Sequence, residues 1–136
     1  MGLALCYLQM GTYPLALKGF QKIVDDFPDV ALAYYYESLA IIAGRRIKIM
    51  PMNDVKKIEN LLNTAIQVDD SCGIAKILLG VLVYDYYELN KMKHGGQSSQ
   101  ELIEMGVNDG VDDGELKRML TAIKIAPELE NFLKQQ

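Results

Sequence analysis

The sequence contains no tryptophan, only two cysteines and a single histidine in 136 residues. Two cysteines cannot hold a structural metal or staple a secreted domain, and Cys6 and Cys72 each lie within an apolar helical pattern. We therefore expect buried free thiols in a reducing compartment. His94 has no cysteine or second histidine near it in the sequence, which predicts a surface group rather than a ligand. The sequence predicts neither a metal site nor a cofactor.

Long runs of basic residues are also missing. The basic side chains occur in short pairs, such as Arg45-Arg46 and Lys56-Lys57, and the formal net charge is −4. An acidic surface offers a phosphate backbone little attraction, so a nucleic-acid partner is not expected. We interpret the basic pairs as solvated helix ends.

No apolar stretch is long enough to cross a bilayer. The longest one, from Ile74 to Tyr84, is interrupted by Lys76. The opening segment is apolar but has no basic leader, and it is broken by Gln9 and Gly11. We expect no membrane association and a cytoplasmic location.

Catalytic signatures are missing too. There is no nucleophile elbow and no phosphate-cradling glycine loop, so an enzyme is not expected. The acidic segment 108–115 looks superficially like a calcium loop, but Val111 and Leu120 occupy two of the ligand positions. A turn followed by a helix cap is the better interpretation.

The chain does contain apolar residues at helical spacing, and half of its residues are hydrophobic. This is enough for one domain with a packed core. Residues 14–24 show one apolar stripe with Pro14 at the first turn, where its missing N–H costs nothing. Helix starts are expected at Asn53 or Asp54, at Ser98 and at Asp112. The last two are each followed three residues later by a glutamate, as in a capping box.

The order and spacing of several residues repeat along the chain. A small residue recurs at Ala4, Ser38 and Gly80 once an insertion near residues 45–52 is allowed. The first unit also contains, in order, the residues Tyr7, Gly11, Ala16, Phe20 and Pro28. This pattern resembles the tetratricopeptide repeat, in which W-x2-L-G-x2-Y is followed by A-x3-F and then by proline over about 34 residues.

The resemblance implies an all-α fold of antiparallel helix pairs that form a short right-handed superhelix, or α-solenoid. We expect one domain over residues 1–136. Its parts are a first repeat at 1–30 that is cut by the start of the chain, a second at 31–70 that contains the insertion, and a divergent third repeat with a C-terminal cap at 73–136. Beyond Asn90 the similarity fades, so the third repeat is expected to keep only its first helix.

In similar proteins the first helices of the pairs line a concave groove that binds peptides. Mapped onto this chain, that face predicts a groove formed by Leu5, Leu8, Gln9, Tyr35, Leu39, Ile42, Ile77, Val81, Tyr84 and Asp85. It lacks the basic-and-asparagine clamp of chaperone-binding relatives. Consecutive helical residues point in different directions, so we expect one tyrosine of 34–36 and one of 84–87 to leave the core.

The predicted function is a protein–protein interaction module that binds a peptide or helix in this apolar groove. One alternative is a structural or oligomerisation tail whose groove is filled by residues 116–133. A homo-oligomer formed through an exposed N-terminal helix belongs to the same alternative.

Overall fold

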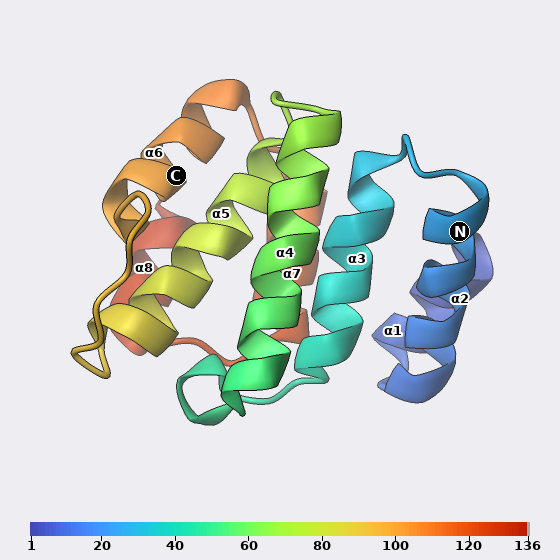
Figure 1. The fold of residues 1–136 in the computed structure, drawn as a ribbon, viewed down its shortest axis with the longest axis horizontal. Coiled ribbons are helices and arrows are strands. Elements are labelled where there is room, and N and C mark those ends of the chain that lie inside the picture. The colour runs from blue at the N-terminus through green and yellow to red at the C-terminus, as the bar shows by residue number, and fades with distance from the viewer. Residues whose placement is uncertain (136) are drawn as a thin grey trace.

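The computed structural model describes residues 1–135, and the secondary-structure elements of this part of the chain are all helices, which confirms the all-α prediction (Figure 1). An isolated parallel bridge joins Arg46 to Lys124. The elements, in chain order, are α1 (Gly2–Gln9), α2 (Tyr13–Asp26), α3 (Ala31–Ile42), the 3-10 turn η1 (Ile47–Ile49), α4 (Met52–Val68), α5 (Gly73–Leu82), the π-helical segment η2 (Val83–Glu88), α6 (Ser99–Asp109), α7 (Asp113–Ala122) and α8 (Pro127–Lys134).

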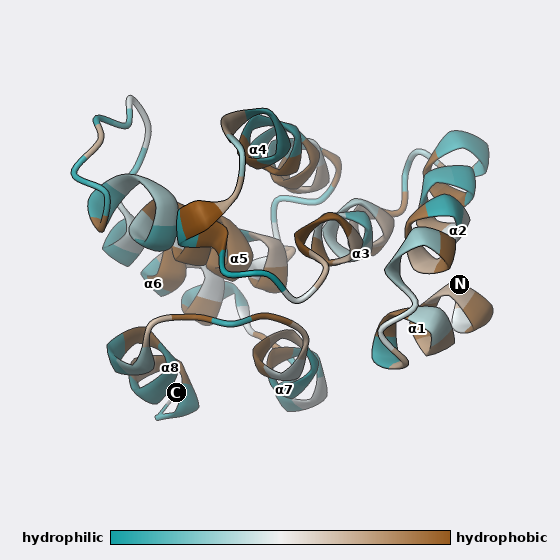
Figure 2. Cartoon of the chain, turned by 90° about the horizontal axis from the view of Figure 1, so that it is seen from below, coloured by the Kyte–Doolittle hydropathy of each residue, from teal (hydrophilic) through white to brown (hydrophobic). Residues whose placement is uncertain are grey.

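Helices that follow one another in the sequence pack side by side from α1 to α6. They form a row from one end of the molecule to the other (Figure 1). The last two helices turn back under this row. Figure 2 shows α3 and α5 between α4 on one side and α7 and α8 on the other. The core therefore lies in the middle of three helical layers.

The recurring small residues mark close contacts within the helix pairs. A Cβ atom at Gly19 of α2 would lie 2.8 Å from the Cβ atom of Ala4 in α1. One at Gly80 of α5 would lie 2.7 Å from Ile103 Cγ1 in α6. Helices can approach this closely only where a side chain is very small. Helix α6, which the capping pattern at Ser98 predicted, packs closely against α5 through this glycine.

Two of the three expected helix caps are present. The Ser98 side chain accepts a hydrogen bond from the Glu101 amide, and Asp112 accepts one from the Glu115 amide. The third expectation is wrong, because α4 begins at Met52, directly after Pro51. Its first turn therefore includes Asp54, whose carboxylate is favourable near the positive end of the helix dipole.

All three tyrosines of residues 34–36 are buried, so the expectation that one of them leaves the core is wrong. Helix α3 packs against both α2 and α4, and the α7 side chains Glu115 and Arg118 bond to its Tyr36. Helix α3 is therefore surrounded by α2, α4 and α7. In the second cluster, Tyr84 is half-buried while Tyr86 and Tyr87 are buried.

Both cysteines are free thiols, as expected, but their burial differs from the prediction. Cys6 is exposed, because α1 contacts the rest of the molecule through its other faces, and Cys72 is half-buried. Within residues 1–135 no helix combines the length and the apolar character that a membrane span requires.

Candidate functional site

The predicted groove residues lie on α1, α3, α5 and η2, but most of them are not open to a partner. Of the ten, six have a relative exposure of 1% or less: Tyr35, Leu39, Ile42, Ile77, Val81 and Asp85. Helices α7 and α8 lie across this face (Figure 2) and contribute Met119 and Leu133, both fully buried, to the same core. These six residues belong to the core, and of them Ile77 borders a small hollow of about 130 Å³ beside α7.

Polar contacts hold α7 against α3. The Tyr36 hydroxyl donates a hydrogen bond to Glu115 Oε1 over 2.6 Å, and Arg118 Nη1 donates to the Tyr36 oxygen over 3.0 Å. Arg118 also pairs with Glu115 at 2.7 Å. Burial and the bond to the Glu115 carboxylate raise the pKa of Tyr36, so the phenol stays neutral and remains a donor.

Helix α8 is fastened to η2 in a similar way. The Tyr84 hydroxyl donates to Glu128 Oε1 over 2.7 Å. This bond is the main reason why the pKa of Tyr84 rises to about 12, and it lowers the pKa of Glu128. Tyr84, predicted to border a peptide groove, therefore bonds to the chain's own last helix.

Asp85 is bound within the chain rather than presented to a ligand. Arg46 donates to both of its carboxylate oxygens, with Nε at 2.8 Å and 3.0 Å and Nη2 at 2.6 Å. The backbone amide of Lys48 adds a fourth contact at 2.9 Å. The insertion near residues 45–52 thus supplies the partners of a buried carboxylate, and interpreting Arg46 as a solvated helix end is wrong. Because the two segments lie far apart in the sequence, spacing could not reveal this pairing.

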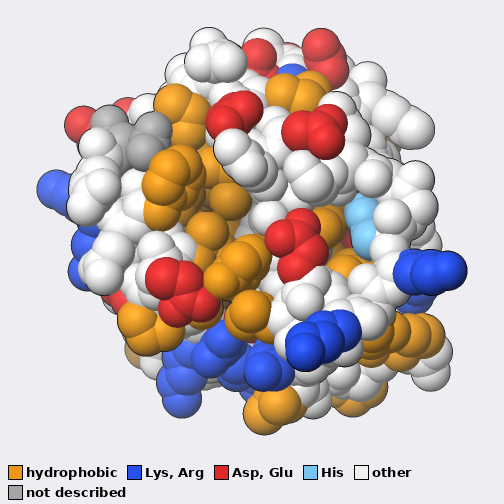
Figure 3. All heavy atoms as spheres, turned by 90° about the vertical axis from the view of Figure 1, so that its left-hand side faces the viewer, with side chains coloured by type: hydrophobic (Ala, Val, Ile, Leu, Met, Phe, Trp, Pro, Cys, Tyr) orange, Lys and Arg blue, Asp and Glu red, His pale blue; other side chains and the backbone are white. Residues whose placement is uncertain are grey.

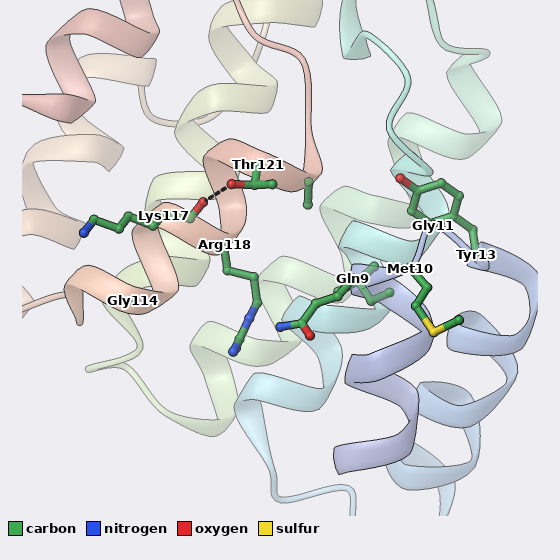
Figure 4. Close-up of a pocket in the computed structure, with 10 residues that line it drawn as sticks. Gln9, Met10, Gly11, Tyr13, Gly114, Lys117, Arg118 and Thr121 are labelled. Carbon is green, nitrogen blue, oxygen red and sulfur yellow. Dashed lines mark hydrogen bonds between the residues drawn. The ribbon is translucent and has the colours of Figure 1, made fainter.

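One part of the inner side stays open, between the C-terminal end of α1 and helix α7. We call this space the α1–α7 cleft. It has a volume of about 450 Å³ and is lined by Leu8, Gln9, Met10, Gly11, Tyr13, Gly114, Lys117, Arg118, Thr121 and Ala122. In Figure 4 the side chains of Gln9 and Arg118 point toward one another, while Lys117 extends away from them. Of the predicted groove, Leu8 and Gln9 line this cleft, and Leu5, half-buried on the same helix, does not.

The walls of the cleft combine apolar and polar groups. Met10 is 74% exposed and supplies an adaptable thioether surface on the α1 side. On the α7 side, Arg118 is held by Glu115, and the Thr121 hydroxyl donates to the carbonyl of Lys117 over 2.9 Å. The Gln9 amide and the Lys117 ammonium are exposed and available. The cleft can therefore accept an apolar side chain next to an acidic or carbonyl oxygen.

Comparison of the chain with protein-family models, curated proteins and solved structures gave no match. What bears on its function is therefore the chemistry of its own surface. Among residues 1–135, histidine, cysteine and carboxylate side chains form no cluster of three or more with the spacing to hold a metal ion.

His94 is half-buried, so the expectation of a simple surface group is wrong. Its ring lies 4.6 Å from that of Tyr87, and its Nε2 atom is 3.9 Å from Glu59 Oε2. The Tyr87 hydroxyl donates to the same glutamate. These contacts tie the loop after η2 to α4, which is a structural role. Residue spacing could not predict these contacts, since Glu59 and His94 belong to separate segments.

Proposed function

We propose that this chain is a tetratricopeptide-like interaction module that binds a peptide segment of another protein in the α1–α7 cleft. The observation that carries the proposal is this open cleft of about 450 Å³ on the inner side of the helical row. Three successive pairs, α1/α2, α3/α4 and α5/α6, support the right-handed superhelix that the sequence resemblance implies, and glycines lie at the contacts of the first and third pairs. The two free thiols suit a reducing compartment such as the cytoplasm.

The walls of the cleft indicate which peptide would fit. An apolar side chain would pack against Leu8, Met10 and Ala122, excluding water from their surfaces. An acidic residue farther along the peptide would face the Lys117 ammonium, which extends away from Gln9 on the α7 side, and the peptide backbone next to the anchor would bond to the Gln9 amide. Recognition of this kind combines an apolar anchor with a few polar contacts that fix its orientation.

Selection of peptides from a displayed random library against the folded protein tests this proposal. We expect the selected sequences to pair an apolar residue with an acidic one. A Met10→Ser/Lys117→Glu variant should bind them at least about tenfold more weakly, because it loses both the apolar wall and the cation. Titration by fluorescence anisotropy measures the change, and Lys93→Glu, an exposed site in the loop before α6, is the matched charge control.

Equal affinity of the double variant and the wild type would refute the cleft as the binding site. Circular dichroism of the variant distinguishes lost binding from lost folding, since both substituted side chains are exposed and should leave the helices intact.

A second candidate function is structural support, in which α7 and α8 occupy the inner face permanently. The contacts of Tyr36 with Glu115 and Arg118 favour it, because they bury the polar groups that would otherwise face a partner. This candidate predicts that the library selection enriches no sequence family at all.

A further inference from the structure

The outer side of the first helix pair presents an uncovered apolar surface. We call it the N-terminal face. Leu3 is 68% exposed, and Met1 and Leu15 are each nearly half exposed. Between α1 and α2 there is a hollow of about 190 Å³, lined by Met1, Leu3, Ala4, Tyr7, Leu15, Gly19 and Ile23. Helices α1 and α2 stand at one end of the row (Figure 1), and no other described helix covers this side.

A large apolar side chain lies at the C-terminal end of α2. Phe27 follows the last turn of α2, where its amide donates to the carbonyl of Ile23, and the residue is 59% exposed. An exposed phenylalanine is a common element of protein interfaces, because burying the ring removes a large apolar area from water.

The exposed charges of α2 and the residues directly after it are divided by sign along the chain. Lys18 and Lys22 come first, and Asp25, Asp26 and Asp29 follow. None of the five takes part in an ion pair within residues 1–135. A helix with positive charge at one end and negative charge at the other is complementary to itself when two copies run antiparallel.

We propose that the N-terminal face binds a second copy of this chain, with the two α2 helices antiparallel and centred near Ile23 and Val24. In that alignment Phe27 of each copy lies opposite Phe20 of the other, one residue from Gly19 in the lining of the hollow. Lys22 then lies opposite Asp25 of the second copy. By the same symmetry Lys18 lies opposite Asp29.

A single twofold register thus pairs both charge signs and brings the Phe27 ring within one residue of Gly19, which lines the hollow. Each contact is made twice, as in the isologous interfaces of closed dimers. The dimer does not depend on the α1–α7 cleft. Its contacts involve α2 and the hollow between α1 and α2, which Tyr7 lines, and neither Gln9 nor α7 takes part.

The opposite end of the molecule fits this face less well. The surface of α6 and α8 shows an apolar patch next to acidic side chains (Figure 3). A hollow of about 410 Å³ there includes Glu88 in its lining together with Ile103 and Leu129. A head-to-tail contact would bring the aspartates of α2 toward further acidic groups, which is unfavourable.

Charge exchange tests the dimer directly. Light scattering after size-exclusion chromatography should give the wild type twice the chain mass of 15.2 kDa. Lys18→Glu/Lys22→Glu makes all four facing positions of α2 and its end acidic, and Asp25→Lys/Asp29→Lys makes the same four positions basic. Each variant alone should have the mass of one chain. An equimolar mixture of the two should return to twice that mass, because opposite charges then face each other along the whole contact.

Two further variants complete the experiment. Lys91→Glu/Lys93→Glu makes the same change in net charge at exposed positions outside the N-terminal face, and it should remain dimeric. Phe27→Ser should shift the wild-type chain to the mass of a monomer. Circular dichroism verifies that every variant keeps its helices.

Three outcomes would overturn the proposal. The wild type could be monomeric even at millimolar concentration, or the folded charge variants could stay monomeric when mixed. An open-ended series of masses would show head-to-tail association instead.

Discussion

The buried ionisable side chains differ in how completely the structure pairs them. Asp85 accepts bonds from Arg46 and Lys48, and the ammonium of Lys76 is bound by Asp109. Pairing of this kind offsets the cost of removing a charge from water. Glu37 on α3 is also buried, but burial is the largest influence on its pKa and raises it above the ordinary value of 4.5. Lys57 partly opposes this shift.

We predict that Glu37→Gln stabilises the protein at neutral pH by roughly 0.5–1 kcal/mol, as removal of an unfavourable charge often does. The native state holds the Glu37 proton more tightly than the unfolded state does. Its contribution is therefore fully present below the ordinary pKa and is lost as the pH rises through the native pKa. The advantage of the glutamine variant should accordingly grow with pH from 4 to about 7.

Urea denaturation of both proteins across this pH range measures the effect. Glu104→Gln on the exposed side of α6 serves as the control, and its free energy of unfolding should stay close to that of the wild type at every pH. If the difference in the free energy of unfolding between the Glu37→Gln variant and the wild type did not change with pH, burial would not raise the pKa of Glu37.

At the scale of helices, α5 and α6 meet through glycines. A Cβ atom at Gly106 would lie 2.6 Å from the Gly73 carbonyl oxygen and 2.6 Å from Ile77 Cγ1. After Leu82 the same helix continues as η2, where the Leu89 amide bonds to the Tyr84 carbonyl with π-helical spacing. In this segment Asp85 bonds to Arg46 and Tyr84 to Glu128, so one altered turn connects α5 to two remote segments.

Gly106→Ala should destabilise the protein by about 1–3 kcal/mol, because the added methyl group meets backbone that cannot move independently. The midpoint of chemical denaturation should fall while the slope stays the same. Gly95→Ala is the matched control, since a Cβ atom there would have nothing within 4 Å. If both variants had the same midpoint, the two helices would not be in the close contact described.

At the scale of the whole molecule, helices from both ends of the chain share one core. Leu8 of α1, Tyr35 of α3, Met119 of α7 and Leu133 of α8 belong to a single cluster of buried side chains. A cap added to a separate solenoid would instead contact only its neighbour. The last two helices should therefore unfold together with the rest.

Met119→Ala tests this cooperativity. The side chain is fully buried, so its truncation should cost about 2–5 kcal/mol and lower one single unfolding transition. Calorimetry and circular dichroism should report the same midpoint. Met52→Ala, at an exposed position in the first turn of α4, should change stability little. A separate early transition for α7 and α8 would show that they form an independent unit.

Local patterns in the sequence were sufficient to predict the helices and several of their ends. The caps at Ser98 and Asp112 depend on residues three positions apart, and the small residues Ala4 and Gly80 follow from a repeated spacing. Such features are encoded within one or two turns. The same patterns also placed Leu8 and Gln9 on the inner side of α1, where they line the cleft.

Only the tertiary structure decided which inner surface stays open. Glu115 and Arg118 reach Tyr36 across a long stretch of chain, and Arg46 reaches Asp85 in the same way. The apolar residues of α3, α5, α7 and α8 indicate only that each helix has a face to bury. Which faces meet depends on how the whole chain packs, because apolar attraction is not directional. Once α7 and α8 cover α3 and α5, the groove predicted along Tyr35 and Ile77 is part of the core, and the open cleft lies beside Gln9.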